Sequence, residues 1–295
     1  MILNTADKTE IEVARSLGIE PNPYQIEDGE LVSSDDNLAL VDSDGTLRLP
    51  DSITSIGEGA FANVSGLKKI IIPGTVKTIK ANAFANNTDL EEVIIEEGVE
   101  TIKSYAFYSC KKLQKITLPN SITSMESLCF NQCSMLDNVK LPNKITTLSQ
   151  QIFMGCSNLK NLELSSNIEK LGIEALSGTA LTKIKFPSKL SSIGSNALNI
   201  NTLTEIDTSE NNFYTFNNGV LYSKDLKTLV LALPNISNIN IENSVEEISG
   251  GAFRLCNNLS TIYLPENVKT IGILAFYNIN LKSISVNENN KYFTV

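Results

Sequence analysis

Histidine and tryptophan are both absent from this sequence of 295 residues. A chain without histidine lacks the side chain that most often transfers protons near neutral pH, and also the commonest metal ligand. Catalysis by Ser-His-Asp or Cys-His groups is therefore excluded, as are zinc sites that contain histidine. Among the 33 acidic residues, no pair stands out as an acid–base pair. We predict that the protein is not an enzyme and has no catalytic residue, no metal site and no cofactor.

Long apolar runs are missing as well. No stretch of 18 apolar residues occurs, so the sequence predicts no membrane span in this chain. The N-terminus carries charge where a signal peptide needs an apolar segment, so this chain shows no signal peptide. We expect either that the protein is not secreted through this end or that its start has been trimmed.

Basic residues are scarce near the N-terminus. Residues 1–45 hold eleven acidic residues against two basic ones, which equals the net charge of −9 of the whole chain. Such an acidic arm argues against nucleic acid as a partner, because nucleic-acid affinity depends on neutralising phosphates. The alternative interpretation is that the arm is a solvated end that keeps the protein soluble.

One phrase recurs through most of the chain. Its Ala-Phe pair is followed by Leu-x-x-Ile-x-Leu-Pro, as in "AFYSCKKLQKITLP", and the spacing of the aromatic is mostly 23 residues. Apolar residues two apart predict a strand, and the proline that follows ends it because proline has no N–H to donate. One such unit cannot bury its apolar face alone, so identical units are expected to stack. The repeated aromatic position is occupied by Phe61, Phe84, Phe107, Phe130, Phe153, Leu176, Leu198, Phe253 and Phe276.

The segment "AFYSCKKLQKITLPNSITSM" resembles the leucine-rich repeats of the bacterial BspA-like surface proteins, also called the Treponema pallidum type. The similarity covers roughly residues 44–286. It implies a β-rich leucine-rich-repeat solenoid of stacked 23-residue repeats with parallel strands.

The repeat is interrupted once. Between Ile206 and Ile239 the aromatic arc is missing, and Asn218-Gly219 lies between two β-rich runs, which is a strong hairpin signal. We therefore expect a β-hairpin island inserted into the solenoid. The expected organisation is an acidic cap or partial island at 1–43, repeats at 44–208, the island at 209–235, and repeats ending in a truncated island at 236–295. Because the ending resembles the start of the island, we expect the chain to be part of a longer protein.

Four of the five cysteines lie three residues after the repeated aromatic, which is typical of small buried side chains and not of one metal or redox site. The strand positions that point away from the core are the candidate binding surface. The candidate binding residues there are Ile71, Ile94, Lys115, Lys140, Lys183, Lys185 and Tyr263, and we expect the four lysines to form a basic band. The alternative is that these are ordinary solvated strand positions.

The BspA-like resemblance implies a non-enzymatic binding array, namely a secreted or cell-surface adhesin that recognises protein ligands of host or neighbouring cells. A glycan is a further candidate ligand, and nucleic acid is not expected. The extracellular or cell-surface localisation is implied by the resemblance alone. The alternative function is a structural spacer within a larger surface protein.

Overall fold

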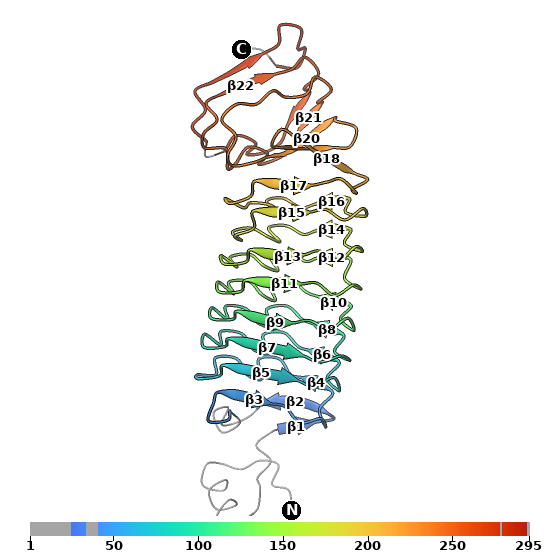
Figure 1. The fold of residues 1–295 in the computed structure, drawn as a ribbon, viewed down its shortest axis with the longest axis vertical. Helices are drawn as coiled ribbons and strands as arrows, with labels where there is room; N and C mark the ends of the chain where they lie inside the picture. Colours follow the sequence, from blue (N-terminus) through green and yellow to red (C-terminus); the bar gives the residue numbers. More distant parts are fainter. Residues whose placement is uncertain (1–24, 34–40, 278, 294–295) are drawn as a thin grey trace, which may run out of the picture.

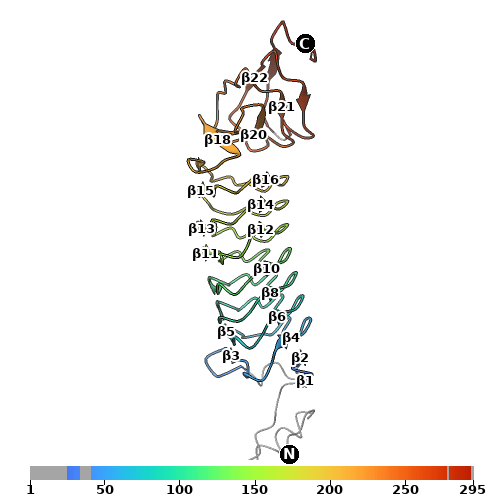
Figure 2. The ribbon, with the colours of Figure 1, turned by 90° about the vertical axis from the view of Figure 1, so that its right-hand side faces the viewer.

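The computed structural model describes residues 25–33, 41–277 and 279–293, and over these ranges it contains strands but no helix. The chain winds into an elongated solenoid whose turns lie one above another (Figures 1 and 2). The stacked units predicted from the 23-residue period and the leucine-rich-repeat solenoid implied by the family resemblance are therefore confirmed. Most of the expected acidic cap at 1–43 falls on 1–24 and 34–40, which lie outside the described residues.

One strand of each regular turn joins a parallel ladder, which we call the strand face. Its register matches equivalent residues of successive repeats, as with Ile70, Val93 and Ile116. The first six strands form one sheet and the others pair two by two. These strands are β3 (Thr46–Arg48), β5 (Lys69–Ile72), β7 (Glu92–Ile95), β9 (Lys115–Thr117), β11 (Asn138–Lys140), β13 (Asn161–Glu163), β15 (Lys183–Lys185), β17 (Glu205–Asp207), β22 (Thr261–Leu264) and β24 (Ser283–Val286).

A second ladder is built from strands of two residues, each lying between a strand-face strand and the arc that carries the aromatic. These strands pair in parallel and in register within three sheets, which hold β4 to β10, β12 to β16, and β21 with β23. They are β4 (Ser55–Ile56), β6 (Thr78–Ile79), β8 (Thr101–Ile102), β10 (Ser124–Met125), β12 (Thr147–Leu148), β14 (Lys170–Leu171), β16 (Ser192–Ile193), β21 (Glu247–Ile248) and β23 (Thr270–Ile271).

The core is a column of identical positions. Phe61, Phe84, Phe107, Phe130 and Phe153 are fully buried, and their rings stack at centroid separations of 5.3–5.6 Å. Each ring therefore packs against the equivalent ring of the next repeat, as the stacking argument predicts.

The arcs are also tied by their backbones. Phe84 N–H donates to Ala106 O, and Asn82 and Asn86 N–H donate to the carbonyls on either side, at 2.7–3.1 Å. Every arc from residue 59 to residue 178 donates these three bonds to the arc that follows it. We call these bonds the arc rungs. They satisfy main-chain groups that would otherwise lose their partners on burial.

The cysteine column packs under these arcs. Cys110 is fully buried, and its Sγ lies 3.2 Å from the carbonyl oxygen of Phe84 in the preceding arc. Burial raises the pKa of the Cys110 thiol to about 12. In the repeat of Phe84, which lacks this cysteine, Asn87 fills the same position and its Nδ2 donates to both Phe61 O and Phe84 O. All five cysteines are free and buried, as expected for packing residues.

The predicted island is an antiparallel meander of β18 (Tyr214–Asn217), β19 (Val220–Ser223) and β20 (Thr228–Ala232). Its turn uses left-handed backbone at Asn218 (φ 48°) and Gly219 (φ 81°), which is why the Asn-Gly pair signals a hairpin. Strand β20 then pairs in parallel with β21 and starts a second stack of repeats. The hairpin of β1 (Gln25–Glu27) and β2 (Glu30–Ser33) occupies the corresponding place before β4.

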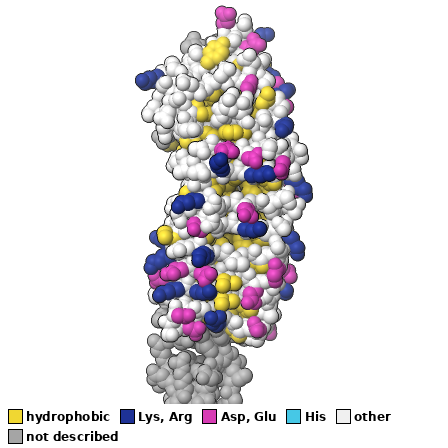
Figure 3. All heavy atoms as spheres, viewed as in Figure 1, with side chains coloured by type: hydrophobic (Ala, Val, Ile, Leu, Met, Phe, Trp, Pro, Cys, Tyr) yellow, Lys and Arg dark blue, Asp and Glu magenta, His cyan; other side chains and the backbone are white. Residues whose placement is uncertain are grey.

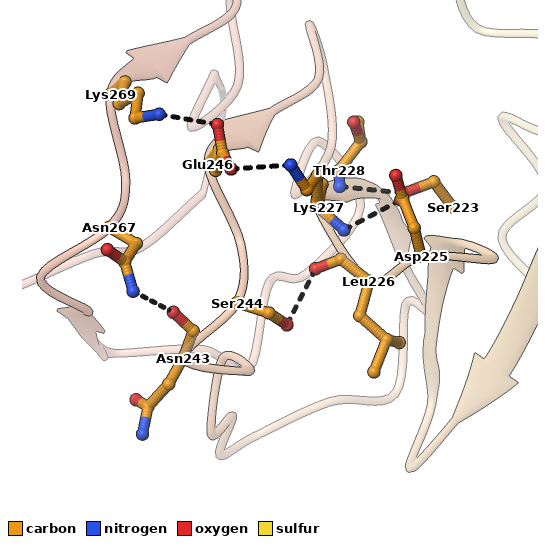
Figure 4. Close-up of polar contacts among 10 residues, drawn as sticks. All are labelled: Ser223, Asp225, Leu226, Lys227, Thr228, Asn243, Ser244, Glu246, Asn267 and Lys269. Atoms are coloured by element: carbon orange, nitrogen blue, oxygen red, sulfur yellow. Dashed lines mark hydrogen bonds and ion pairs between the residues drawn. The ribbon is translucent and has the colours of Figure 1, made fainter.

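A carboxylate fastens the meander to the repeats that follow. Figure 4 shows Glu246 accepting from Lys227, at 3.1 Å, and from Lys269, at 2.6 Å. Ser244 Oγ also donates to Leu226 O beside it. The contacts join three successive levels of the stack.

One expected strand is not present. The alternating apolar residues Ile239 and Ile241 fit the repeated strand phrase, but this segment has no ladder partner among the described residues and is irregular. Ile241 is nevertheless buried in the second of two apolar clusters. The apolar pattern thus predicts burial correctly, whereas strand formation also needs a neighbouring strand in register.

Candidate functional site

The outward side chains of the strand face form two rows, one on each side of the buried middle residue. Strand register places Ile71 beside Ile94, and Lys140 beside Glu163. The rows run along the stack because each strand of the ladder adds one residue to each row. This geometry presents an extended surface with one side chain of each row per repeat.

Ile71 and Ile94 form a small apolar spot. They are directly paired in the parallel ladder of β5 and β7, and both are half-buried. The next residues in the same row are Arg48 and Thr117. Figure 3 shows that hydrophobic side chains on this view are bordered by charges of both signs. The two isoleucines are therefore brought together, as their spacing predicts.

The lysines of the strand face are matched by carboxylates. Lys140 Nζ lies 3.5 Å from Glu163, Lys183 Nζ lies 2.6 Å from Glu205, and Lys185 Nζ lies 2.7 Å from Glu210. The expected basic band is thus interrupted by an acid at each of these three lysines. Similarly, the Lys69 and Glu92 side chains are 2.7 Å apart. The surface is a series of alternating charges, not a field of one sign.

These pairs shift the ionisation of the lysines. The hydrogen bond from Lys183 to Glu205 raises the pKa of Lys183, and the bond to Glu210 raises that of Lys185. Both lysines are exposed, so the pairs contribute little to stability. They do orient the amines toward particular neighbours along the stack.

Lys115 differs from the other three lysines. Its ladder neighbours are Glu92 and Asn138, and Glu92 already bonds Lys69. Within the described part of the chain no carboxylate lies within ion-pair distance of Lys115. It is exposed and one strand beyond the isoleucine pair, so a cation lies close to the apolar spot.

Tyr263 is not brought to this spot. It lies on β22 in the second stack, where its ladder partner is Ser285, and 47% of its surface is exposed. The meander and several repeats separate it from Ile94 along the molecule (Figure 1). The seven candidate residues therefore share a type of position but do not form one cluster.

The described residues contain no group of three or more histidine, cysteine, aspartate or glutamate side chains suited to hold a metal ion. Among the same residues, none lies in a helix long and apolar enough to cross a membrane.

Sequence reasoning missed the charge pairing, although its signal was present. An opposite charge one repeat later, such as Lys140 and Glu163, indicates a pair once the register is known. The bond from Lys185 to Glu210 carries no such signal, because the partner lies in the turn after β17 and not on the next rung.

This architecture, with parallel strands on one face, a phenylalanine column and proline-ended strands, defines a leucine-rich-repeat solenoid. The profile described as BspA type leucine rich repeat region, with six copies, matches residues 45–153, 126–234 and 232–294. The chain therefore belongs to the BspA-type leucine-rich repeat family. Repeat arrays of this family are typically non-catalytic.

Solved structures agree with this family. A leucine rich cell surface protein from Faecalibacterium prausnitzii A2-165 is 31% identical, with a TM-score of 0.73 over 82% of this chain and 69% of that protein. The pneumococcal vaccine antigen PcpA shares the fold at 20% identity, with a TM-score of 0.58, and this chain covers 64% of its length. No curated protein matches the sequence.

Proposed function

We propose that the chain is the binding array of a cell-surface adhesin and that its strand face recognises a protein ligand. The observation that carries the proposal is the apolar pair Ile71 and Ile94, which lies among charges on an extended ladder. Lys115 lies on the next strand of that ladder. Solenoids commonly bind through such extended surfaces. The description of the F. prausnitzii relative as a cell surface protein supports a cell-surface location for this chain.

The recognition would combine an apolar anchor with paired charges. A partner side chain that covers the isoleucines supplies affinity, while alternating charges fix the register of the partner along the stack. The ligand is therefore a protein with an apolar anchor and a rim of both charge signs. A glycan remains the alternative ligand, and a binding signal for an isolated glycan would favour it.

The test compares adhesion of purified variants to a panel of cells and matrix proteins. The double variant Ile71→Ser and Ile94→Ser should lose most of the adhesion. The control is Ile173→Ser, because Ile173 is 48% exposed but lies in an arc, away from the strand face. If the control loses adhesion and the double variant keeps it, the partner uses another face and the proposal is wrong.

Charge reversal tests the contribution of the paired charges on the strand face. Lys140→Glu with Lys185→Glu should weaken adhesion, and restoring one pair by adding Glu163→Lys should recover part of it. Lys103→Glu serves as the control, because Lys103 pairs with Glu126 beside the second ladder. Added salt should weaken adhesion by the wild-type chain in the same sense, since exposed charges are screened over ~8–10 Å.

The second candidate function is a structural spacer. The matching of strand-face lysines by carboxylates favours it, because such pairs leave little unbalanced charge for a partner. Absence of adhesion by the wild-type chain to every cell and matrix protein of the panel would support the spacer.

A further inference from the structure

The missing arc of the island leaves a hollow on the arc side of the molecule. In the regular stack, each arc donates its rungs to the next one, ending with Glu174 and Leu176, which donate to the arc at 195–199. The next arc along the chain begins only at Gly250, because the meander supplies strands instead of an arc. A cavity of about 240 Å³ lies between these two arcs.

The near wall of the cavity carries open donors. Asn196 N–H and Leu198 N–H occupy the positions that donate arc rungs in the preceding repeats. Neither donates to an acceptor in the described part of the chain. They are the backbone edge of an interrupted ladder, and such an edge is a template for adding another chain.

The far wall carries open acceptors. The carbonyls of Gly250, Ala252 and Arg254 occupy the accepting positions of the ladder, and the meander fills only the middle one, through Ala232 N–H at 2.8 Å from Ala252 O. The carbonyls of Gly250 and Arg254 receive no hydrogen bond from any described residue. An occupant that fits between the walls must therefore both accept and donate, as a polypeptide backbone does.

Two side chains add to this pattern. Asn199 donates through Nδ2 to Ser177 Oγ, but its Oδ1 is buried in the cavity lining and finds no donor among the described residues. Arg254 also lines the cavity, stacks over the Tyr277 ring at 5.9 Å, and has no carboxylate within ion-pair distance in the described ranges. An unmatched guanidinium favours an occupant that carries a carboxylate.

The cavity opens toward an apolar rim. A second hollow of about 430 Å³ shares Ser195, Asn196 and Arg254 with the first, and extends to Ile273 and Leu274. Ile273 is 86% exposed and Leu274 is 54% exposed. The two hollows share part of their lining and adjoin one another, and together we call them the slot.

From the open donors, the open acceptors and the unmatched arginine, we propose that this slot binds an extended segment of a partner protein that carries an acidic side chain. The backbone of the segment takes the place of the missing arc, and its carboxylate pairs with Arg254. This site lies on the arc side and is independent of the strand face, so the two proposals can fail separately.

The probe is a blocked pentapeptide, Ala-Ala-Asp-Ala-Ala, and the matched peptide has Asn in place of Asp. Binding is followed by the amide signals of Asn196 and Leu198 in ¹H–¹⁵N spectra, with Gln151 and Phe153 as internal controls whose rungs are already formed. We expect saturable shifts at the first pair only. The Asp peptide should bind about tenfold more tightly than the Asn peptide, because hydrogen bonds to a charged group are the stronger ones.

Two variants locate the site. Arg254→Gln should make the affinities for the Asp and Asn peptides about equal. Ser195→Trp should fill the slot and abolish binding of both peptides. Gln150→Trp is the control for the latter, since Gln150 holds the same place in an arc whose rungs are complete. Unchanged thermal unfolding verifies that each variant is folded. Absence of binding to the wild type, equal affinity for the two peptides, or equal loss in both tryptophan variants overturns the proposal.

Discussion

Removal of one ring from the phenylalanine column tests whether the repeats stabilise one another. Phe107 is fully buried and stacks on Phe84, at 5.3 Å, and on Phe130, at 5.5 Å. Phe107→Ala should therefore lower the free energy of unfolding by ~4 kcal/mol, through lost burial, a cavity and two lost ring contacts. Urea denaturation followed by circular dichroism measures the change.

Two further variants show whether position in the column decides the loss. Phe276 is half-buried and has one stacked neighbour, Phe253, so Phe276→Ala should cost only about 2 kcal/mol. Tyr105→Ala removes an aromatic that is 38% exposed in the same arc as Phe107 and should cost under ~1 kcal/mol. If Phe107→Ala costs no more than Tyr105→Ala, the stacked column does not hold the repeats together.

Three other outcomes are expected. The thiols should be unreactive until the chain unfolds, because burial raises the pKa of Cys110, Cys156 and Cys256 to about 12; thiol titration in native and denatured protein checks this. The hydrogen bonds from Lys269 and Lys227 lower the pKa of Glu246. The stabilisation by ionised Glu246 is therefore present above about pH 4.3 and is lost as the pH falls through the lowered pKa. Glu246→Gln should flatten that part of a plot of Tm against pH. Asn211→Ala should destabilise the meander by about 2 kcal/mol, because two backbone carbonyls and two backbone N–H groups lose their hydrogen-bond partner. Asn212→Ala should be nearly neutral in the same unfolding assay.

The sequence predicts the ladders well because their period is nearly constant. With a spacing of 23 residues, the partner of Ile71 in the next repeat has to be Ile94, and the structure pairs them. The Asn-Gly turn of the island is equally readable, since a turn of that type requires positive φ at both positions. Local rules suffice wherever each residue repeats the environment of its counterpart.

Prediction fails where the repeat is broken. The apolar pattern at Ile239–Ile241 indicates a strand, but no neighbouring strand lies in register to pair with it. The partner of Lys185 was not predictable either, because Glu210 lies in the turn and is reached by a choice of side-chain conformation. Both cases depend on three-dimensional neighbours that a period of 23 residues does not specify.

The same break explains why the island can offer a partner backbone groups that a regular arc does not offer. A regular arc satisfies its main-chain groups through the rungs to the next arc, so it offers a partner only its side chains. The meander starts a new sheet of the second stack, since β20 pairs with β21, but it supplies just one of the three arc rungs, through Ala232. The chain thus packs two apolar clusters and leaves unpaired backbone groups at the level of the stack where they meet. In a repeat protein this is where specificity for a peptide backbone can arise, because it requires an interruption that the regular repeat does not contain.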